Sequence, residues 1–443
     1  MAGIFVKSSK WNLNTLTGNV KLVIAIDIGT TSSVYAYSMS SDLCGVHLNK
    51  LWDSGDRGLC SSKTPTCILL SKTFEPIYIG YDAQNEYKLL IDENEEDDYI
   101  FVDKFKMELY DAKNISDEMK IDDIKGHPVP AIQVFSSMFS LLKKRIESEI
   151  KNIDSRLINN NVQWVLTIPA AWTDRAEFFI RTCAEKAEIH NDNLMIVIES
   201  ESASVYMHHV FKELPNKYLL IDLGGGTDDI TAHRVSKKGK LHEICKPSGN
   251  CHGGKHVDKQ LFSCLEEIVG KQVIQNLKTK GNFLELLNEF ENINYSISTS
   301  NAKHIACKFP LPLLNELCRK YRGKEFQEVL NYSKYKTSLF LKNGKLRIHR
   351  EFIIGFISNV AALVVKDIQF VLKKAKPHDI DTFIVVGGFS NSNVIRDTFE
   401  NAFPTVSIIY PVSDGDLAVV KGAVLYGQNP NYIKPCKKTA NLK

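Results

Sequence analysis

A glycine-rich turn between two apolar runs is the stretch of this sequence best suited to binding an anion. The first apolar run ends at Asp222, and after the turn a second, alternating run begins. The turn itself contains Gly224, Gly225, Gly226 and Thr227. Glycines have no Cβ, so their backbone N–H groups can close on an anion, and Thr227 adds a hydroxyl. Asp222 lies where a hydrated cation could bridge to phosphate. The stretch therefore predicts a β-hairpin whose turn binds phosphate.

A second copy of this pattern lies near the N-terminus. There an apolar run ends at Asp27 and is followed by Gly29, Thr30 and Thr31 before another outgoing run. One such turn alone could be an ordinary flexible turn, but the shared Asp-x-Gly pattern favours phosphate binding for both. A duplication on this scale implies two similar lobes, each presenting one hairpin to a shared cleft.

A lysine and a glutamate are candidates for catalysis in such a cleft. Lys104 and Lys106 flank an aromatic residue, and a lysine directed at phosphate would stabilise the transferring phosphoryl group. A pair of surface lysines explains this stretch equally well. Glu199 ends the apolar run 194–198, so it would lie at the rim of the cleft and could position the attacking water. Its alternative role is that of an acid at a helix N-terminus.

A glycine pair near the C-terminus would let a nucleotide approach the backbone. Gly387 and Gly388 lie between an expected strand at 382–386 and the helix that follows it. There a flat ring or a sugar could press on the backbone at a helix N-terminus, although a simple tight turn is the alternative. Asp416, which opens the expected helix at 417–426, completes the candidate cofactor-binding residues.

Residues 245–256 contain two cysteines and two histidines, a composition that invites a zinc interpretation. Their spacing, however, fits no common zinc finger. Gly253 and Gly254 lie within the same segment and indicate close approach of the backbone to another group. We therefore expect a loop that contacts ribose or phosphate through these two glycines rather than a metal site.

Composition limits the classes of partner. The chain has 443 residues, 44% of them hydrophobic, which is enough for more than one domain with its own core. A formal charge of +3 gives no argument for nucleic acid or an acidic membrane as partner. The ten cysteines include no Cys-x-x-Cys pair, and residues 1–20 lack the apolar core of a signal peptide or anchor. We expect a cytoplasmic protein with no nucleic-acid or membrane partner.

Hydrophobic periodicity predicts the elements that position these residues. Helices are expected at 129–152, 174–187, 202–211, 257–276, 282–301 and 350–374, and buried strands at 164–170 and 194–199. Residues 43–90 read as short strands and turns, and the acidic run 92–98 as a solvated loop.

The order of the motifs resembles the phosphate loops, connecting helices and adenosine loop of the actin and heat shock protein 70 superfamily. The motifs are Asp-Ile-Gly-Thr-Thr-Ser, Thr-Ile-Pro-Ala, Ile-Glu-Ser-Glu-Ser-Ala, Asp-Leu-Gly-Gly-Gly-Thr-x-Asp, Val-Gly-Gly-Phe-Ser and Lys-Gly-Ala-Val-Leu-Tyr-Gly. Segments 105–107, 164–172 and 421–427 look more like the divergent member-12 branch of the heat shock protein 70 family than like its ordinary chaperones.

The resemblance implies an α/β, actin-like ATPase (ribonuclease H-like) fold. Two duplicated lobes, each with a five-stranded mixed sheet, would close on a nucleotide cleft that binds MgATP. The chain would then divide into an N-terminal extension (1–20), lobe I (21–213), lobe II (214–429) and a C-terminal tail (430–443).

The resemblance also implies a role for individual residues. Asp27 and Asp222 would hold hydrated Mg²⁺, and Glu199 and Asp229 would orient the attacking water and the metal. Lys106 would be the lysine of the cleft, with Lys104 as the alternative. The phosphates would contact Thr30, Thr31, Gly225, Gly226 and Thr227, and the adenosine would rest on Gly387 and Gly388.

Three departures from the family pattern bear on the expected function. Residues 288–294 contain no Lys or Arg to clamp adenine, and Asn391 stands where the family often has Arg, so nucleotide could bind weakly. Ser200 replaces the proline that usually follows Glu199, which leaves the geometry for water open. We expect no peptide-gripping domain after the last lobe helix, and hence not a self-contained foldase.

The expected function is an ATP-binding switch that hydrolyses ATP slowly and reports its nucleotide state to an unidentified protein partner or co-chaperone. Its ligands would be ATP or ADP and Mg²⁺. Two alternatives remain. The protein could be a nucleotide-sensing scaffold with negligible hydrolysis, or a small-molecule kinase, because Asp-Ile-Gly-Thr-Thr-Ser also resembles sugar kinases.

Overall fold

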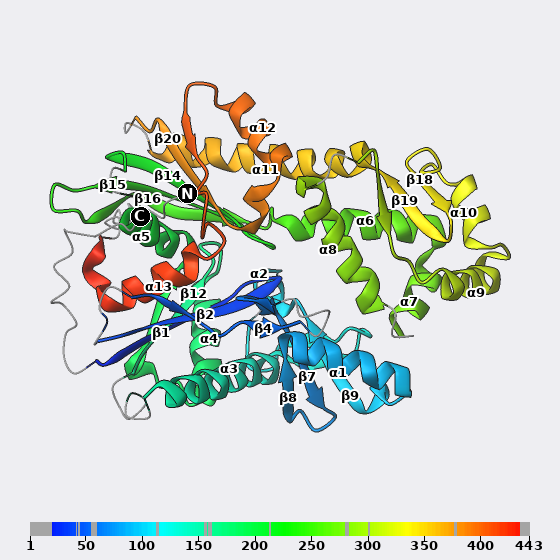
Figure 1. The fold of residues 1–443 in the computed structure, drawn as a ribbon, viewed down its shortest axis with the longest axis horizontal. Helices are drawn as coiled ribbons and strands as arrows, with labels where there is room; N and C mark the ends of the chain where they lie inside the picture. Colours follow the sequence, from blue (N-terminus) through cyan, green and yellow to red (C-terminus); the bar gives the residue numbers. More distant parts are fainter. Residues whose placement is uncertain are drawn as a thin grey trace, which may run out of the picture.

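Two large mixed sheets, each centred on one of the Asp-Gly hairpins, organise the molecule (Figure 1). The computed structural model describes residues 20–40, 42, 45–54, 60–111, 115–154, 157, 162–211, 214–279, 283–299, 302–375 and 379–434. Nearly all of the expected N-terminal extension and residues 435–443 of the expected tail therefore lie outside the described residues.

The sheet of lobe I has the strand order β13-β12-β1-β2-β3, and β6 also pairs with β2. Its strands are β1 (Leu22–Ile28), β2 (Ser32–Met39), β3 (His47–Leu48), β6 (Thr64–Pro65), β12 (Val162–Ile168) and β13 (Leu194–Ile198). The expected hairpin is confirmed, because β1 and β2 pair antiparallel with Asp27 opposite Val34.

The sheet of lobe II has the order β21-β20-β14-β15-β16-β22. Its strands are β14 (Lys217–Leu223), β15 (Asp228–Val235), β16 (Leu241–Asn250), β20 (Thr382–Val386), β21 (Ser407–Ile409) and β22 (Ile433–Lys434). The hairpin of β14 and β15 is confirmed too, with Asp222 opposite Asp229.

The two sheets repeat the same topology, which confirms the expected duplication. In each, the central strand pairs antiparallel with the next strand of the hairpin and parallel with a strand that arrives much later in the chain. Each sheet has six strands rather than the expected five. The extra ones, β6 and β22, are two-residue strands, too short to show a periodicity in the sequence.

Both central strands are buried on both faces, which explains their continuous apolar runs. In β14, Leu219 and Ile221 face the core formed with α6 and α11, whereas Leu220 faces a second core shared with α5 and α13. Ile24 and Ala25 of β1 divide in the same way between two cores. Alternate side chains of one strand thus anchor both layers of helices.

The helices of lobe I and the segment linking the lobes are α1 (Gly80–Glu93), α2 (Glu108–Asp111), α3 (Ala131–Ile153), α4 (Asp174–Lys186) and α5 (Glu199–Val210). The expected cap of α4 is present, since the Thr173 hydroxyl accepts a hydrogen bond from the backbone N–H of Ala176 at 3.3 Å.

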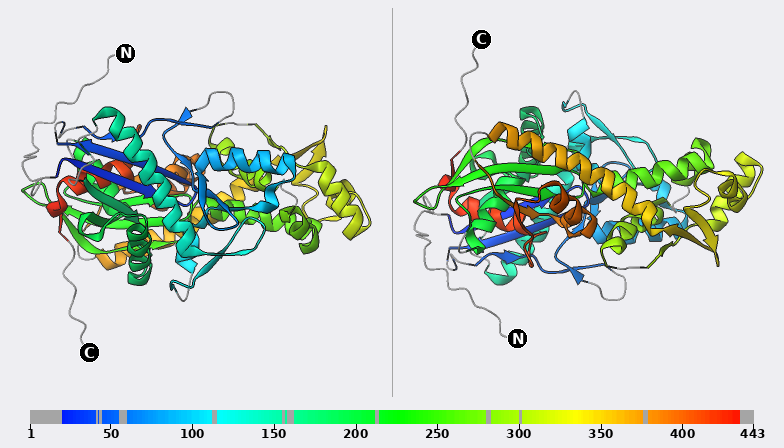
Figure 2. Two further views of the ribbon diagram at one scale, coloured as in Figure 1. Left: turned by 90° about the horizontal axis from the view of Figure 1, so that it is seen from below. Right: turned by 90° about the horizontal axis from the view of Figure 1, so that it is seen from above.

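The helices of lobe II are α6 (Gly254–Val269), α7 (Lys271–Thr279), α8 (Phe283–Thr299), α9 (Leu311–Arg322), α10 (Phe326–Tyr332), α11 (Arg350–Ala375), α12 (Asn393–Ala402) and α13 (Ala418–Gln428). The long helix α11 contacts β15 and β16 of the large sheet and reaches β19 of a peripheral sheet, and its course is visible in the right-hand view of Figure 2.

Smaller sheets extend each lobe on the right of Figure 1. Lobe I carries β7 (Cys67–Ser71), β8 (Pro76–Ile79) and β9 (Tyr99–Asp103), together with the pairs β4 (Trp52–Asp53) with β5 (Cys60–Ser61) and β10 (Lys120–Asp122) with β11 (Pro128–Pro130). Lobe II carries β17 (His304–Cys307), β18 (Leu339–Lys342) and β19 (Lys345–His349).

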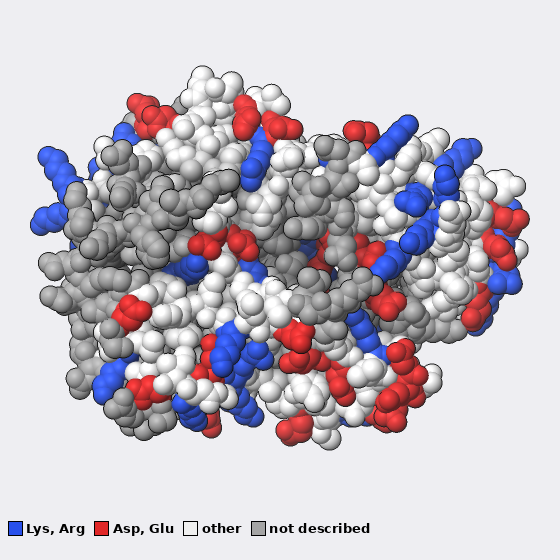
Figure 3. Space-filling view, in the orientation of Figure 1, with Lys and Arg blue, Asp and Glu red and all other residues white. Residues whose placement is uncertain are grey.

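Some local expectations were wrong. Residues 80–93 form α1 rather than strands and turns, because Ala83, Tyr87 and Leu90 recur at helical spacing and fill one core. The acidic run ends α1 and continues into a 3₁₀ turn at Glu96–Asp98 rather than a loop. It is largely exposed, and Figure 3 shows acidic side chains gathered over this region at the lower right.

Two helix boundaries also differ. The helix expected at 257–276 is divided at Gly270, whose φ of +92° ends α6, and α5 starts at Glu199 rather than at 202. Helices α5 and α13 cross closely at Gly422, where a Cβ would lie 1.7 Å from the carbonyl oxygen of Ser202. None of the described helices combines the length and apolar character needed to cross a bilayer.

Candidate functional site

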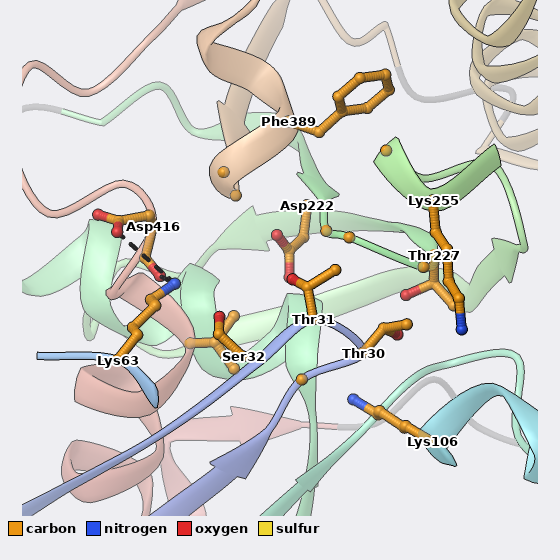
Figure 4. Close-up of a pocket in the computed structure, with 18 of the residues that line it drawn as sticks. Thr30, Thr31, Ser32, Lys63, Lys106, Asp222, Thr227, Lys255, Phe389 and Asp416 are labelled. Atoms are coloured by element: carbon orange, nitrogen blue, oxygen red, sulfur yellow. Dashed lines mark hydrogen bonds and ion pairs between the residues drawn. The ribbon is translucent and has the colours of Figure 1, made fainter. Parts of the chain in front are cut away.

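A cavity of about 340 Å³ opens between the two hairpins (Figure 4). Most of the predicted site residues line it, and they come from both lobes. Those lining the cavity are Asp27, Gly29, Thr30, Thr31, Lys106, Glu199, Asp222, Gly224, Gly225, Gly226, Thr227, Gly254, Gly387, Gly388 and Asp416. Asp229 and Gly253, also predicted, are not among the lining residues.

The two turns close in the same way. The backbone N–H of Gly29 donates to the carbonyl of Ser32 at 3.0 Å, and that of Gly224 donates to the carbonyl of Thr227 at 2.9 Å. Each turn therefore begins with a glycine bonded three residues ahead. This arrangement leaves the central N–H groups of both turns in the cleft, where an anion can accept from them.

The turns differ in their side chains, and they fit together across the cleft because the threonines of one lie over the glycines of the other. A Cβ on Gly225 would lie 2.6 Å from the side chain of Thr31, and one on Gly226 would lie 2.2 Å from the Thr30 hydroxyl. The threonines of lobe I thus occupy the space above the bare backbone of lobe II. Glycine is required there by this close approach, since neither glycine has a positive φ.

Four carboxylates and one lysine form the centre of the site. Lys106 makes a buried ion pair with Glu199, while Asp27, Asp222 and Asp229 lie close enough to affect the pKa of this pair. Burial, reinforced by Asp229 and Asp27, raises the pKa of Asp222 to about 7. Burial likewise raises the pKa of Asp229 to about 6 and that of Glu199 to about 8, although Lys106 opposes the latter shift.

The Thr-Ile-Pro-Ala segment orients two of these carboxylates. The Thr167 hydroxyl donates to Oδ1 of Asp27 at 2.8 Å, and the backbone N–H of Ala170 donates to Oδ1 of Asp229 at 2.6 Å. Lobe I therefore fixes the rotamer of an acid in lobe II. Both roles were missed from the sequence, where only the order of motifs marked this segment.

The donor set fits a hydrated magnesium ion. Magnesium prefers oxygen ligands and keeps several of its waters, and the acids here offer only oxygen. Oδ2 of Asp229 is buried and accepts no hydrogen bond from the described residues. Burial, together with the neighbouring carboxylates, raises the pKa values of Glu199 and Asp222, so a cation at this point would be favourable.

The two candidate lysines lie in different places. Lys106, on the 3₁₀ turn Phe105–Met107, lines the cavity and points toward Thr30 (Figure 4). Lys104 instead forms an ion pair with Glu291 of α8, which links the lobes. Asp103 and Glu291 raise the pKa of Lys104 against the effect of burial.

Several residues of the cavity were missed from the sequence, among them Lys255, Lys63 and Phe389. Lys255 directly follows Gly254 at the start of α6, so its place beside a glycine pair was a usable signal. Lys63 donates to the carbonyl of Asp416 at 2.5 Å, a pairing between lobes that nothing in the local sequence indicates. Phe389 lines the cavity at the start of the segment after Gly388.

The two glycine pairs, Gly253 with Gly254 and Gly387 with Gly388, let the backbone approach the second turn and line the cavity. Gly387 has a φ of +86°, and a Cβ there would lie 2.4 Å from the carbonyl of Leu223, so the pair fits directly behind the second turn. Gly254 lines the cavity, whereas Gly253 packs against the backbone of Gly225 and Gly226. Of the positions expected to clamp adenine, the side chains of Asn292 and Asn294 lie outside the described residues, and Asn391 lines the cavity.

Comparisons with known proteins agree with this geometry. The family model for Hsp70 proteins matches residues 23–429. The chain is 26% identical to heat shock 70 kDa protein 12A of Homo sapiens, across 93% of this chain and 70% of that protein. It is also 26% identical to heat shock 70 kDa protein 12B of Homo sapiens, across 93% and 69%. A chaperone protein HscA homolog of Rickettsia prowazekii is 24% identical, across 71% of this chain and 43% of that protein.

Proposed function

The chain belongs to the Hsp70 family, with the α/β actin-like ATPase fold that its motifs imply, and we propose that it is a switch that binds ATP and hydrolyses it slowly. One observation carries the proposal: two glycine turns closed by the same hydrogen bond face each other across a cavity lined by acids and lysines. A nucleotide held there would contact both lobes at once, so its state would control how the lobes close.

Each part of the site would have a distinct task. The N–H groups of the two turns and the hydroxyls of Thr30, Thr31 and Thr227 would bind the phosphates. Asp27 and Asp222 would hold the hydrated Mg²⁺, which when bound offsets the negative charge of the phosphates. Gly387 and Gly388 would support the adenosine, as Asp416 and Lys63 close the cavity beside them.

The hydrolytic step would depend on the Lys106 and Glu199 pair. Lys106 is held in its charged form by Glu199, so it can stabilise the charge that develops on the γ-phosphate. Glu199 lies at the end of a strand of lobe I, where burial raises its pKa against the opposing effect of Lys106, so its carboxylate can orient a water and accept a proton from it. Asp229, fixed by Ala170, would orient the water or the metal from the other lobe.

ATP turnover by the purified chain tests the proposal. We expect slow release of phosphate that falls about 100-fold in Lys106→Ala, because removing one preorganised charge at the transferring group has an effect of this order. Asp27→Asn and Asp222→Asn should also lose turnover. Lys72→Ala serves as the control, since Lys72 is exposed and paired with Asp98 outside the cleft. Equal rates in all variants would refute the assignment.

A nucleotide-sensing scaffold is the second candidate. It is favoured by Asn391, which lines the cavity without offering the cation that often clamps adenine in this family, and by residues 288–294, which contain no Lys or Arg. Nucleotide affinity and turnover measured on the same preparation separate the two candidates. Binding without turnover would identify the scaffold.

The proposed setting is the cytoplasm, and the proposed reader of the switch is a protein partner or co-chaperone. Lobe closure would change the surface around α1 and α8, whose residues together line a second cavity. A partner that binds both sides would sense the nucleotide state.

A further inference from the structure

A second group of ligating side chains lies directly behind the turn of lobe II. Asp228 and Asp229 are consecutive residues of β15, so their side chains project from opposite faces of the sheet. Asp229 is bonded to Ala170 of lobe I, on the cleft side. Asp228 points away from the cleft, toward His252 and toward Asp367 of α11.

The three side chains converge on one point. Nδ1 of His252 lies 2.6 Å from Oδ2 of Asp367 and 3.5 Å from Oδ1 of Asp228. One ligand atom from each of the three residues lies within 4.8 Å of the others. Asn250 donates to Oδ1 of Asp367 at 2.8 Å, which fixes that carboxylate and leaves its Oδ2 directed at the group.

Of the three residues, Asp228 has the environment that most favours a bound cation. Its side chain is 0% exposed, and one oxygen, Oδ1, accepts a 3.2 Å hydrogen bond from the backbone N–H of His252. The other oxygen, Oδ2, has no hydrogen-bond partner in the described part of the chain. A buried carboxylate oxygen without a donor is unfavourable, and a cation is the usual way to satisfy it.

The charge of this group also favours a bound cation. The Asp228 side chain is fully buried, and those of His252 and Asp367 are each 20% exposed. With both carboxylates ionised and the imidazole protonated, this group carries one net negative charge. A divalent ion bound by neutral histidine and two carboxylates would balance it.

We propose that Asp228, His252 and Asp367 bind one Zn²⁺ ion. Imidazole and carboxylate are zinc ligands, and three protein ligands with a water in the fourth position form a common tetrahedral arrangement. Ligand atoms around such an ion are roughly 3.3 Å apart, as zinc bond lengths of about 2.0 Å require. The 3.5 Å between Nδ1 of His252 and Oδ1 of Asp228 is already close to this distance. The shorter contact between His252 and Asp367 is a hydrogen bond that zinc would replace, releasing the Nδ1 proton.

Such an ion would join three elements that surround the nucleotide turn. Asp228 begins β15, Asp367 belongs to α11, and His252 precedes the glycine pair at which α6 begins. Gly254 and Lys255 at that end of α6 line the main cavity. Zinc would therefore stabilise the wall of the cleft without taking part in phosphate binding.

Titration of the full chain with Zn²⁺, without nucleotide or Mg²⁺ and in competition with a chromophoric chelator, tests the site. We expect one tight equivalent, and an affinity lowered by about 100-fold in both Asp367→Asn and His252→Gln, since each removes a ligand. Zn²⁺ should also raise the Tm of the unmodified chain but not that of these variants. His256→Gln is the matched control, because His256 is a neighbouring histidine 6.3 Å from His252 between ring centroids and outside the group.

Cobalt distinguishes this site from the cysteines. Co²⁺ should bind with visible absorption bands but without the charge-transfer band of a thiolate ligand, since the group contains no cysteine. Zinc that binds equally well to Asp367→Asn and His252→Gln, a thiolate band with Co²⁺, or no binding at micromolar zinc would each overturn the proposal.

Discussion

The two hairpins that face the cleft have the same backbone but opposite surfaces. In lobe I the turn carries the hydroxyls of Thr30 and Thr31, and in lobe II the matching turn is bare at Gly225 and Gly226. The two fit together because the threonines fill the space that the glycines leave open. A duplicated element has thus become complementary to its own copy, which a pair of identical turns could not achieve.

The aspartates of the two hairpins differ as well. Asp27 is half-buried and accepts a hydrogen bond from the Thr167 hydroxyl, whereas Asp222 is 5% exposed and lies among other acids. The pKa of Asp222 is raised to about 7 by burial, then by Asp229 and Asp27. The charged form of Asp222 is therefore disfavoured, and a cation in the cleft would stabilise it.

The largest expected effect comes from filling the bare turn. Gly226→Ala places a methyl group 2.2 Å from the Thr30 hydroxyl and 2.5 Å from Sδ of Met107, so the turns must separate. We expect MgATP affinity, measured by calorimetry, to fall by roughly 10- to 100-fold, the effect of an overlap worth about 1–3 kcal/mol. The double variant Gly226→Ala, Thr30→Ala should recover only part of the loss, because Sδ of Met107 and the Cβ of residue 30 still lie 2.5 Å and 2.9 Å from the added methyl group.

The control for this prediction is Gly355→Ala on α11. A Cβ there meets nothing within 4 Å, so the same chemical change should leave affinity unaltered. If Gly226→Ala bound MgATP as tightly as Gly355→Ala, the two turns would not need to interlock.

The next effect concerns the stability of the chain without Mg²⁺ or nucleotide. Asp222 binds a proton more tightly when folded than when unfolded, so its charge destabilises the fold increasingly as pH rises from about 4 to about 7. Asp222→Asn removes this penalty. At pH 8 its free energy of unfolding should exceed that of the unmodified chain by an amount on the order of 2 kcal/mol, which is seen as a higher Tm. This difference should vanish near pH 4.

Asp27→Asn provides the contrast within the same comparison. Asparagine keeps an acceptor for the Thr167 hydroxyl, and Asp27 is less buried than Asp222, so we expect a smaller change in Tm at pH 8. A gain in Asp27→Asn as large as that in Asp222→Asn would mean that the two aspartates are equivalent after all.

The smallest expected effect tests how the lobes are held together at the cleft entrance. Glu291→Gln weakens the ion pair with Lys104, which joins lobe I to α8, while leaving the turns untouched. We expect nucleotide to dissociate a few times faster in a stopped-flow measurement, because a partly exposed pair contributes about 1 kcal/mol. An unchanged dissociation rate would show that the turns alone hold the lobes on the nucleotide.

Sequence reasoning predicted the parts of the molecule in which local chemistry and position coincide. Asp27 and Asp222 were recognisable because an apolar strand, an acid and a glycine follow each other in the chain, and Glu199 because it ends a buried strand. The long helices were predictable from their periodicity, whereas α1 was missed because its buried side chains are few and Gly80 and Tyr81 open it in place of a polar cap.

The remaining parts depend on long-range contacts. Lys63 meets Asp416 across more than 350 positions of the chain, and no local pattern reports such a pairing. The same holds for Asp367, which α11 brings to His252 and Asp228. The spacing within residues 245–256 does not indicate zinc, because the partners of His252 come from β15 and α11. Only the fold reveals that group.

A crystal structure of the chain with Mg²⁺ and a nonhydrolysable ATP analogue tests the central claim most directly. The account predicts triphosphate density between the turns at Gly29–Thr31 and at Gly224–Thr227, with the metal beside Asp27 and Asp222. A nucleotide bound elsewhere, or in contact with the turn of one lobe only, would contradict it.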